Sequence, residues 1–172
     1  IKDSCLASLV DGSYKIVDKV LCSAFLERWM PETNTFHMPF GEMTITLDDV
    51  STILGVSVSG RSVVLTEEQK NMADEKLVSK ALGISEEEAL EQLKEKRGSS
   101  VRMDWLLSRF EKVSDSKTQK ERECAARAYL LYLLGCTLFS DKSGTRVPCS
   151  YLHFLMDLSE VHKYAWGAAA LA

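Results

Sequence analysis

One stretch of the chain limits its possible folds more than any other. Residues 125–139, with the sequence AARAYLLYLLGCTLF, are apolar on almost every side of a helix. A helix that is apolar all round has to be enclosed by other elements, so the stretch predicts a central core helix from about Lys117 to Phe139. Gly135 lies inside it. Because glycine weakens a helix interior by about 1 kcal/mol relative to alanine, we expect another helix to approach closely there.

The composition fits a single, mainly α-helical domain around this helix. The chain has 172 residues, of which 45% are hydrophobic and 27% charged, with only three prolines and nine glycines. A domain of this size buries about 70% of the surface that its unfolded chain exposes, so it needs neither a metal nor a disulfide to fold. Its five cysteines are odd in number and contain no close pair, which is typical of a reduced, intracellular protein.

The local patterns predict a helical bundle with one small β-hairpin. Apolar residues recur at helical spacing over residues 14–29, and Pro31 ends that helix. Residues 35–46 favour strands on both sides of a turn, which predicts the hairpin. Further helices are expected at residues 47–54, 66–82, 86–97, 101–110, 149–158 and from 161 onward. Three of them begin with a capping-box pair: Thr46 with Asp49, Thr66 with Gln69, and Ser85 with Glu88.

Charge is concentrated in residues 66–98, which hold nine acidic and six basic residues. Charge at this density is typical of a solvated helical surface. The whole chain has a formal net charge of −4. A domain that holds nucleic acid mainly through phosphates is usually strongly basic or carries a basic stripe, so the charge argues against that class.

The sequence contains no convincing motif for catalysis, a cofactor or a metal. Cys149 and His153 stand four residues apart, a spacing that suits two zinc ligands on one helix face, and His162 would be a third. A structural zinc site needs a fourth ligand, so we interpret this spacing as a coincidence. His37 and Glu42 lie on opposite arms of the predicted hairpin, and we interpret them as a structural pair. We therefore predict no cofactor, no metal and no enzymatic activity.

Residues 46–57 have the pattern of the first helix and turn of a helix-turn-helix. That motif requires a recognition helix directly after the turn. Residues 58–64 contain Gly60 and β-branched residues and have no helical period. We therefore do not expect this element to read DNA.

Three blocks of the sequence resemble the plant mobile domain family. The first is residues 27–50 (ERWMPETNTFHMPFGEMTITLDDV), followed by 53–56 and Gly60. The second is residues 126–144 (ARAYLLYLLGCTLFSDKSG), and the third is 164–172 (YAWGAAALA). We interpret residues 1–172 as a single domain with a variable charged helical insertion at 66–98. Because no helix-stop signal follows Trp166, we expect the domain to continue beyond Ala172.

The resemblance implies a plant nuclear protein, found both in host genes and inside transposable elements. It implies roles in transposon silencing, gene expression and genome stability. The implied partners are a protein phosphatase 7-like protein and other plant mobile domain proteins, with no membrane and at most weak or indirect DNA association. We expect a non-enzymatic protein–protein interaction module in the nucleus. A nucleic-acid-binding domain derived from a transposable element is the alternative.

Two interpretations remain for the hairpin signature. In the first, large apolar residues hold the β element against the helices: Trp29, Phe36, Phe40 and Ile45. In the second, Trp29, Phe40 and Glu42 form a docking surface for a partner. Burial distinguishes the two, because exposed aromatic residues favour docking. Trp166 is a further candidate, which either packs on the preceding helix or docks a partner or a second copy.

Overall fold

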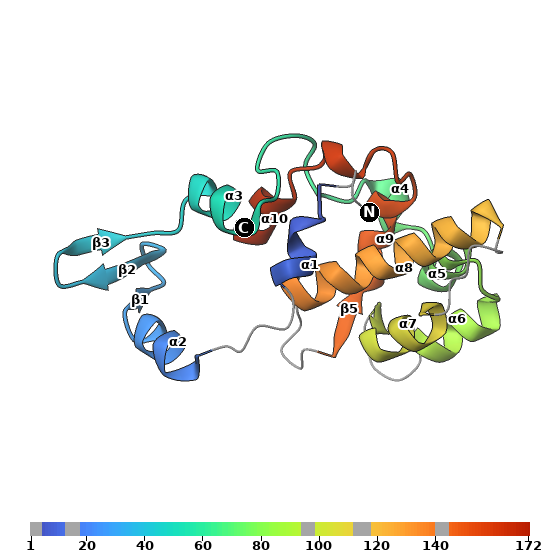
Figure 1. The fold of residues 1–172 in the computed structure, drawn as a ribbon, viewed down its shortest axis with the longest axis horizontal. Helices are drawn as coiled ribbons and strands as arrows, with labels where there is room; N and C mark the ends of the chain where they lie inside the picture. The colour runs from blue at the N-terminus through green and yellow to red at the C-terminus, as the bar shows by residue number, and fades with distance from the viewer. Residues whose placement is uncertain (1–4, 13–17, 94–98, 112–117, 140–144) are drawn as a thin grey trace.

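The chain folds into a helical body from which a smaller arm projects (Figure 1). The computed structural model describes residues 5–12, 18–93, 99–111, 118–139 and 145–172. Its architecture is mainly α with two small antiparallel sheets, as the sequence predicts for the fold class. We call residues 18–54 the arm and the other described residues the body. In the described residues, no helix combines the length and the apolar character that a membrane span needs.

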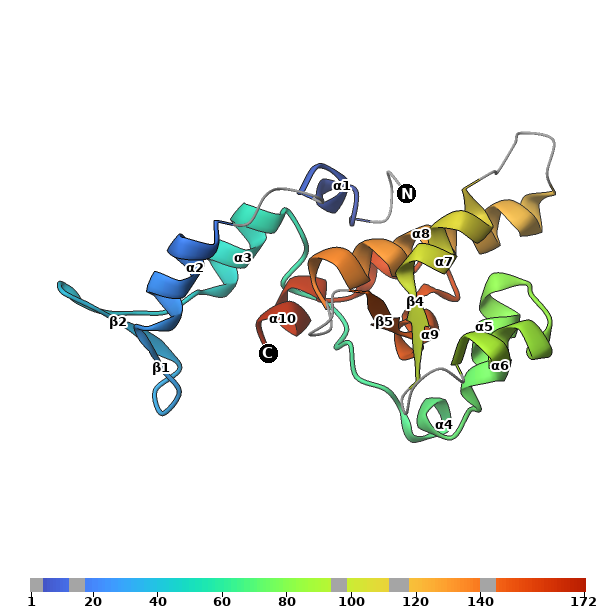
Figure 2. The same cartoon turned by 90° about the horizontal axis from the view of Figure 1, so that it is seen from below.

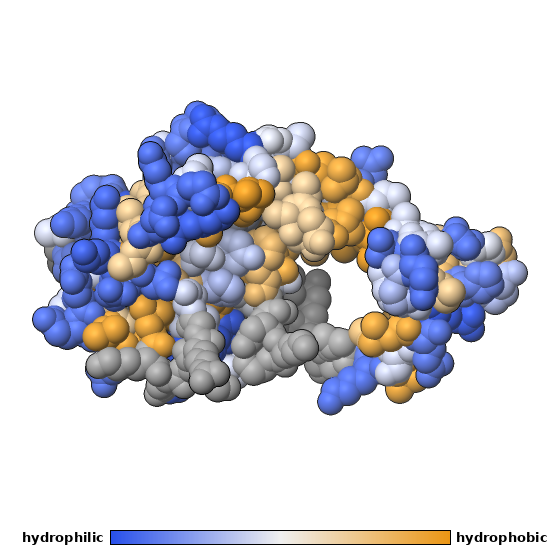
Figure 3. All heavy atoms as spheres, turned by 180° about the vertical axis from the view of Figure 1, so that it is seen from behind, coloured by the Kyte–Doolittle hydropathy of each residue, from blue (hydrophilic) through white to orange (hydrophobic). Residues whose placement is uncertain are grey.

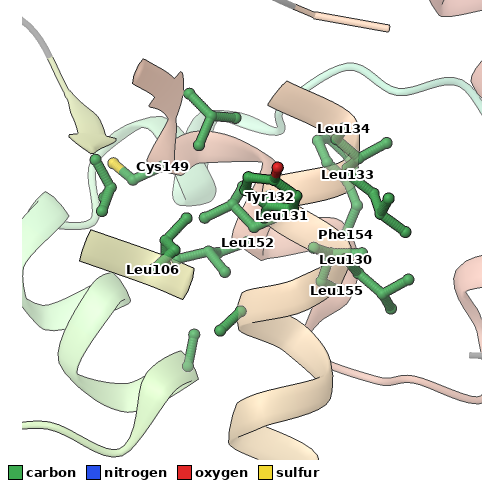
Figure 4. Close-up of a cluster of buried hydrophobic side chains, with 14 of the residues drawn as sticks. Leu106, Leu130, Leu131, Tyr132, Leu133, Leu134, Cys149, Leu152, Phe154 and Leu155 are labelled. Atoms are coloured by element: carbon green, nitrogen blue, oxygen red, sulfur yellow. The ribbon is translucent and has the colours of Figure 1, made fainter. Parts of the chain in front are cut away.

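Helix α8 (Gln119–Thr137) runs through the middle of the body, as the apolar stretch predicts. It begins with a capping box, in which Thr118 and Glu121 each accept a hydrogen bond from the other's backbone N–H. Its buried residues are Cys124, Ala125, Ala128, Leu130, Leu131, Tyr132, Leu133, Leu134 and Gly135. Figure 4 shows the leucines of α8 meeting Leu106, Leu152 and Leu155 from other helices, which makes α8 the centre of the core.

Shorter helices surround α8. They are α1 (Ser8–Gly12), α5 (Asp74–Leu82), α6 (Glu86–Leu93), α7 (Met103–Phe110) and α9 (Leu152–Leu155). In Figure 2, α5 and α6 lie at the end of the body away from the arm. The inner face of α5 buries Leu77, Val78, Ala81 and Leu82. The charged segment 66–98 therefore contributes to the core as well as to the surface.

Two predicted glycine stops are confirmed, whereas the helix expected between them is broken in two. Gly55 and Gly83 end α3 and α5 in the left-handed conformation, at φ 64° and 69°. The helix expected over 66–82 is wrong as a single element: the structure has α4 (Glu67–Lys70) and then α5. Helix α4 ends with Asn71 as its C-cap, a residue type that is disfavoured inside a helix.

A two-stranded sheet also packs against α8. Strand β4 (Ser100–Arg102) pairs antiparallel with β5 (Arg146–Pro148), with Val101 opposite Val147. The helix expected over 101–110 therefore begins two residues later, at Met103, because Val101 belongs to strand β4. The close approach predicted at Gly135 is present, and it involves Met103 of helix α7 as well as Val147 of β5. A Cβ on Gly135 would lie 2.7 Å from the Cβ of Val147.

The C-terminal segment is tied to residues 57–61 by backbone hydrogen bonds. Arg61 donates its N–H to the Lys163 carbonyl at 2.8 Å, and Ala165 donates to the Arg61 carbonyl at 2.9 Å. Gly60 has a φ of 134°, and a Cβ there would lie 2.3 Å from the Lys163 oxygen. This pairing explains why the helix expected from Val161 is interrupted between a 3₁₀ turn, η2 (Val161–Lys163), and α10 (Trp166–Leu171). Similarly, the helix expected over 149–158 is a 3₁₀ turn, η1 (Cys149–Tyr151), followed by the short α9.

The arm contains a helix, a three-stranded sheet and a second helix. In chain order these are α2 (Lys19–Leu26), β1 (Trp29–Met30), β2 (Thr35–Met38), β3 (Gly41–Met43) and α3 (Leu47–Leu54). The expected hairpin over 35–46 is confirmed, and the two-residue β1 adds a third antiparallel strand. Residues 14–17 of the helix expected over 14–29 lie outside the described residues. The described part of this helix ends at Leu26 because Trp29 belongs to β1, and none of the residues of α2 is buried.

Candidate docking surface on the arm

The arm is held together by a small aromatic cluster. The ring of Phe25 from α2 meets Phe36 of β2 edge-on, with centroids 5.6 Å apart, and Trp29 of β1 meets Phe36 at 4.9 Å. Trp29, Phe36 and Met43 are register partners across the three strands, so they lie on one face of the sheet. Helix α2 covers that face at Phe36. Phe36 therefore packs the sheet against Phe25 of α2, as the first interpretation of the hairpin predicts for this residue, and Trp29 packs beside Phe36 within the sheet.

Many other apolar residues of the arm remain open to solvent. Phe40, at the turn between β2 and β3, is 79% exposed, and Ile53 of α3 is 77% exposed. The remaining exposed apolar residues of the arm are Val20, Leu21, Phe25, Leu26, Met30, Met43, Ile45 and Leu47. Phe40 and Ile45 thus do not hold the sheet against the helices, which corrects the first interpretation for these two residues. An exposed apolar cluster of this kind marks an interaction site more often than a single exposed residue does.

Figure 3 shows the arm as a separate lobe on which apolar residues alternate with hydrophilic ones. Glu42 of β3 lies opposite His37 of β2 in the register, as expected for the two sides of the hairpin, and both are exposed. Asp49 has a structural role: its carboxylate accepts from the N–H and the hydroxyl of Thr46, and these hydrogen bonds lower the pKa of Asp49. Trp29, Phe40 and Glu42 thus share one lobe, with Trp29 half-buried and the other two at the surface.

Helix α3 is the root of the arm. Val50 is its buried residue, and it packs against Gly167 of α10, where a Cβ would lie 3.1 Å from the Val50 side chain. At the other end of α3, the Ser8 hydroxyl donates to the Gly55 carbonyl at 3.1 Å. These contacts fix α3 to the body, and α3 in turn carries the sheet and α2 outward (Figure 1).

The expectation that Trp166 docks a partner is wrong, because Trp166 is fully buried. Its indole N–H donates to the Val161 carbonyl at 2.9 Å. Its ring lies among those of Phe139, Phe154 and Tyr164, at centroid distances of 6.4, 6.2 and 5.9 Å. Trp166 is thus a core residue that anchors α10, and of the four candidate docking residues only those of the arm remain: Trp29, Phe40 and Glu42.

Cys149 and His153, the two residues whose spacing would suit zinc ligands, lie near the carboxylate of Asp74. The buried Cys149 thiol donates to Asp74 Oδ1 at 3.6 Å, and Ser99 donates its hydroxyl to Oδ2. Burial, with the neighbouring Asp74 charge, raises the pKa of Cys149 to about 12, and burial lowers the pKa of His153. The thiol is therefore protonated and unreactive at neutral pH. Across the described ranges, no group of three or more His, Cys, Asp or Glu residues is placed to hold a metal.

Two buried or half-buried arginines bind backbone carbonyls of the body. Arg127 of α8 donates to the carbonyls of Leu155 and Met156 at 3.2 and 3.0 Å, which ties α8 to the end of α9. Arg146 of β5 donates to the Gln92 carbonyl at 2.9 Å. Since these guanidinium groups act within the fold, they are not placed to bind phosphates. The helix-turn-helix pattern also lacks its second half, because residues 55–66 follow α3 without a helix.

The sequence model of the plant mobile domain matches residues 7–172, which include the whole arm and the described body beyond its first two residues. The chain belongs to the plant mobile domain family. This confirms the resemblance carried by the three sequence blocks. The structure explains several of their residues: Phe36 and Trp29 build the arm, Gly60 meets the C-terminal segment, and Trp166 anchors α10. No solved structure matches the chain.

The chain is similar to several curated proteins of Arabidopsis thaliana. It is 42% identical to Protein MAINTENANCE OF MERISTEMS over 166 residues, and 41% identical to Protein MAIN-LIKE 1 over 152 residues. These matches cover 94% and 88% of this chain but 33% and 29% of the relatives. It is also 38% identical over 167 residues to a Serine/threonine-protein phosphatase 7 long form homolog, covering 94% of this chain and 12% of that protein. The chain thus spans a third or less of the length of these relatives.

Proposed function

We propose that this plant mobile domain is a non-enzymatic protein–protein interaction module of the nucleus. In this proposal it acts in transposon silencing, gene expression and genome stability, with a protein phosphatase 7-like protein as partner. The observation that carries the proposal is the arm, which projects from the body and exposes Phe40, Ile53 and other apolar residues to solvent. A soluble domain seldom leaves such a surface open unless another molecule covers it.

The relatives support the choice of partner. A matching segment occurs in Protein MAINTENANCE OF MERISTEMS and also in a protein named as a phosphatase 7 long form homolog. A segment that occurs in one relative named as a phosphatase, and in other relatives with other names, suits a module that works together with a phosphatase. We extend this pairing to the present chain as part of the proposal.

The binding test uses the purified chain and a purified protein phosphatase 7-like protein in isothermal titration calorimetry. We expect a complex whose affinity falls at least about tenfold in Phe40→Ser, because an exposed aromatic anchor contributes much of the energy of an interface. Leu90→Ser is the matched control, since Leu90 is a 41% exposed apolar residue on α6 of the body. Failure of the wild-type chain to bind would overturn the choice of partner.

The alternative, a nucleic-acid-binding domain derived from a transposable element, predicts a different result. Titration of labelled duplex DNA at two salt concentrations should show only weak binding, because the chain is acidic overall. Submicromolar binding that falls steeply with salt would favour the alternative. A fluorescent fusion of the chain, imaged in plant cells, tests the nuclear location directly.

A further inference from the structure

The exposed apolar residues of the arm are combined with a concentration of acidic charge. Residues 18–54 contain six acidic residues against two basic ones, Lys19 and Arg28, which gives a formal net charge of −4. This equals the net charge of the whole chain, so the remaining residues sum to zero. The acidic residues are Asp18, Glu27, Glu32, Glu42, Asp48 and Asp49, and all six are exposed.

Several of these carboxylates adjoin exposed apolar side chains in the sequence. Glu27 follows Leu26, Glu42 lies two residues after Phe40, and Asp48 follows Leu47. In the part of the chain that the structure describes, Glu27, Glu32 and Glu42 have no ion-pair partner. The arm therefore presents acidic groups whose charge is not compensated within the fold, next to apolar groups that the fold does not cover.

We propose that the arm is the docking site for a basic amphipathic helix of a partner protein. This inference rests on the proposed function and names the chemistry of the segment that the arm binds. A helix with apolar residues at positions i, i+3 and i+4 and with lysine or arginine beside them would cover the exposed apolar side chains of the arm and compensate its negative charge. The arm supplies enough apolar area. The ten exposed apolar side chains of the arm, which each expose roughly half of about 150 Å², amount to roughly 750 Å² over all its faces, against the about 800 Å² per partner of a standard interface.

Charge and strand length disfavour the other occupants of this surface. A second copy of the chain would place one arm with a charge of −4 against another of the same sign, and like charges oppose association. Duplex DNA is excluded from the arm for the same reason. An added β-strand would find only a short edge, since β1 has two residues and β3 has three. A basic helix is the occupant that satisfies both the apolar and the acidic groups.

The experiment measures the binding of labelled synthetic peptides to the intact chain by fluorescence anisotropy. The probe is a peptide of about five helical turns with leucines on one face and lysines on the other. One control peptide keeps the leucines and replaces every lysine by glutamate. A second control has the composition of the probe in a scrambled order, so that it keeps the charge but has no apolar face.

We expect the lysine peptide to bind at least about tenfold more tightly than either control, and its affinity to fall as sodium chloride rises. Phe40→Ser, Ile53→Ser and Glu42→Lys should each weaken its binding at least about threefold. Leu90→Ser and Glu87→Lys are matched controls on α6, a helix of the body that also combines exposed acidic and apolar residues. These two variants should bind the lysine peptide as the unmodified chain does.

Several outcomes would overturn the inference. Equal binding of the lysine and glutamate peptides would remove the charge argument, and equal effects of the α6 and arm variants would remove the location. Light scattering that shows a dimer, lost in Phe40→Ser, would assign the arm to a second copy. The proposed function can fail separately. If the lysine peptide binds the arm but the phosphatase 7-like protein does not bind the chain, the inferred docking chemistry is supported and the proposed partner is refuted.

Discussion

Replacing Gly135 by alanine should destabilise the protein, although alanine is the better helix former. Gly135 lies in the buried part of α8, and a Cβ there would lie 2.7 Å from Val147 Cβ and 2.8 Å from Met103 Sδ. The methionine sulfur is near the end of a flexible side chain and can move. The Val147 Cβ is bonded directly to the backbone of β5, so relief of that contact requires the strand to shift.

The two opposing effects can be weighed. Alanine gains about 1 kcal/mol of helix propensity over glycine. Overpacking a well-packed core costs about 1–3 kcal/mol. For Gly135→Ala we therefore expect a net loss of roughly 1 kcal/mol in the free energy of unfolding. Gly135→Leu adds three more carbon atoms at the same place, and we expect a loss of roughly 1–3 kcal/mol.

Thermal unfolding followed by circular dichroism measures these effects. For a chain of this length, 1 kcal/mol corresponds to about 2–4 °C in Tm, so Gly135→Ala should melt about 2–4 °C lower and Gly135→Leu lower still. Ala126→Gly, in the half-buried part of the same helix, calibrates the propensity effect and should also lower Tm. If Gly135→Ala raised Tm, propensity alone would govern the site, and the close contact with β5 would be refuted.

Three further predictions concern the body. Gly60→Ala should lower Tm more than Gly135→Ala does. A Cβ at Gly60 would overlap the Lys163 carbonyl oxygen at 2.3 Å, and the φ of 134° at Gly60 disfavours any side chain. An equal or smaller loss in Tm would contradict this. Arg127→Lys should cost about 1–3 kcal/mol in urea unfolding, since lysine cannot reproduce the guanidinium hydrogen bonds to two carbonyls, and an unchanged midpoint would count against that role. The raised pKa of Cys149, about 12 against an ordinary 9.0, means that the folded state keeps a proton that the unfolded chain loses. Its contribution to the free energy of unfolding is therefore complete below pH 9 and should decline above it by up to about 1.4 kcal/mol per pH unit. Urea unfolding at pH 8 and pH 10 should show a smaller decline in Cys149→Ser than in the unmodified chain, and equal declines would refute the assignment.

The sequence predicts the features that depend on neighbouring residues. A helix that is apolar on all sides has to be enclosed by other elements, so residues 125–139 predict the place of α8 in the core. Capping pairs such as Thr46 with Asp49 act within one turn, and glycines such as Gly83 stop a helix through their own backbone conformation. These features were predicted because each of them is decided within a few residues.

The features that sequence reasoning missed depend on residues far apart in the chain. The pairing of Val101 with Val147 cannot be read from either three-residue strand, and it changes the start of α7. The spacing of apolar residues in α2 is the same whether the helix packs against a core or covers a small sheet. The exposure of Leu26 therefore could not be predicted from the residues around it. The burial of Trp166 likewise depends on two aromatic rings from other segments, those of Phe139 and Phe154. For the docking surface, the charge of residues 18–54 was readable from the sequence, whereas the exposure of Phe40 required the fold.

The backbone pairing of Arg61 with Lys163 and Ala165 has a consequence for the order in which the protein forms. The two segments are separated by about 100 residues, so the body cannot close until the ribosome has made nearly all of it. The aromatic contacts of the arm all lie within residues 18–54, which are synthesised well before the C-terminal segment. At typical rates of synthesis the interval is roughly 5–20 s. During that time the nascent chain already carries Phe40 and its acidic neighbours, while α3 still lacks its contact with Gly167 of α10.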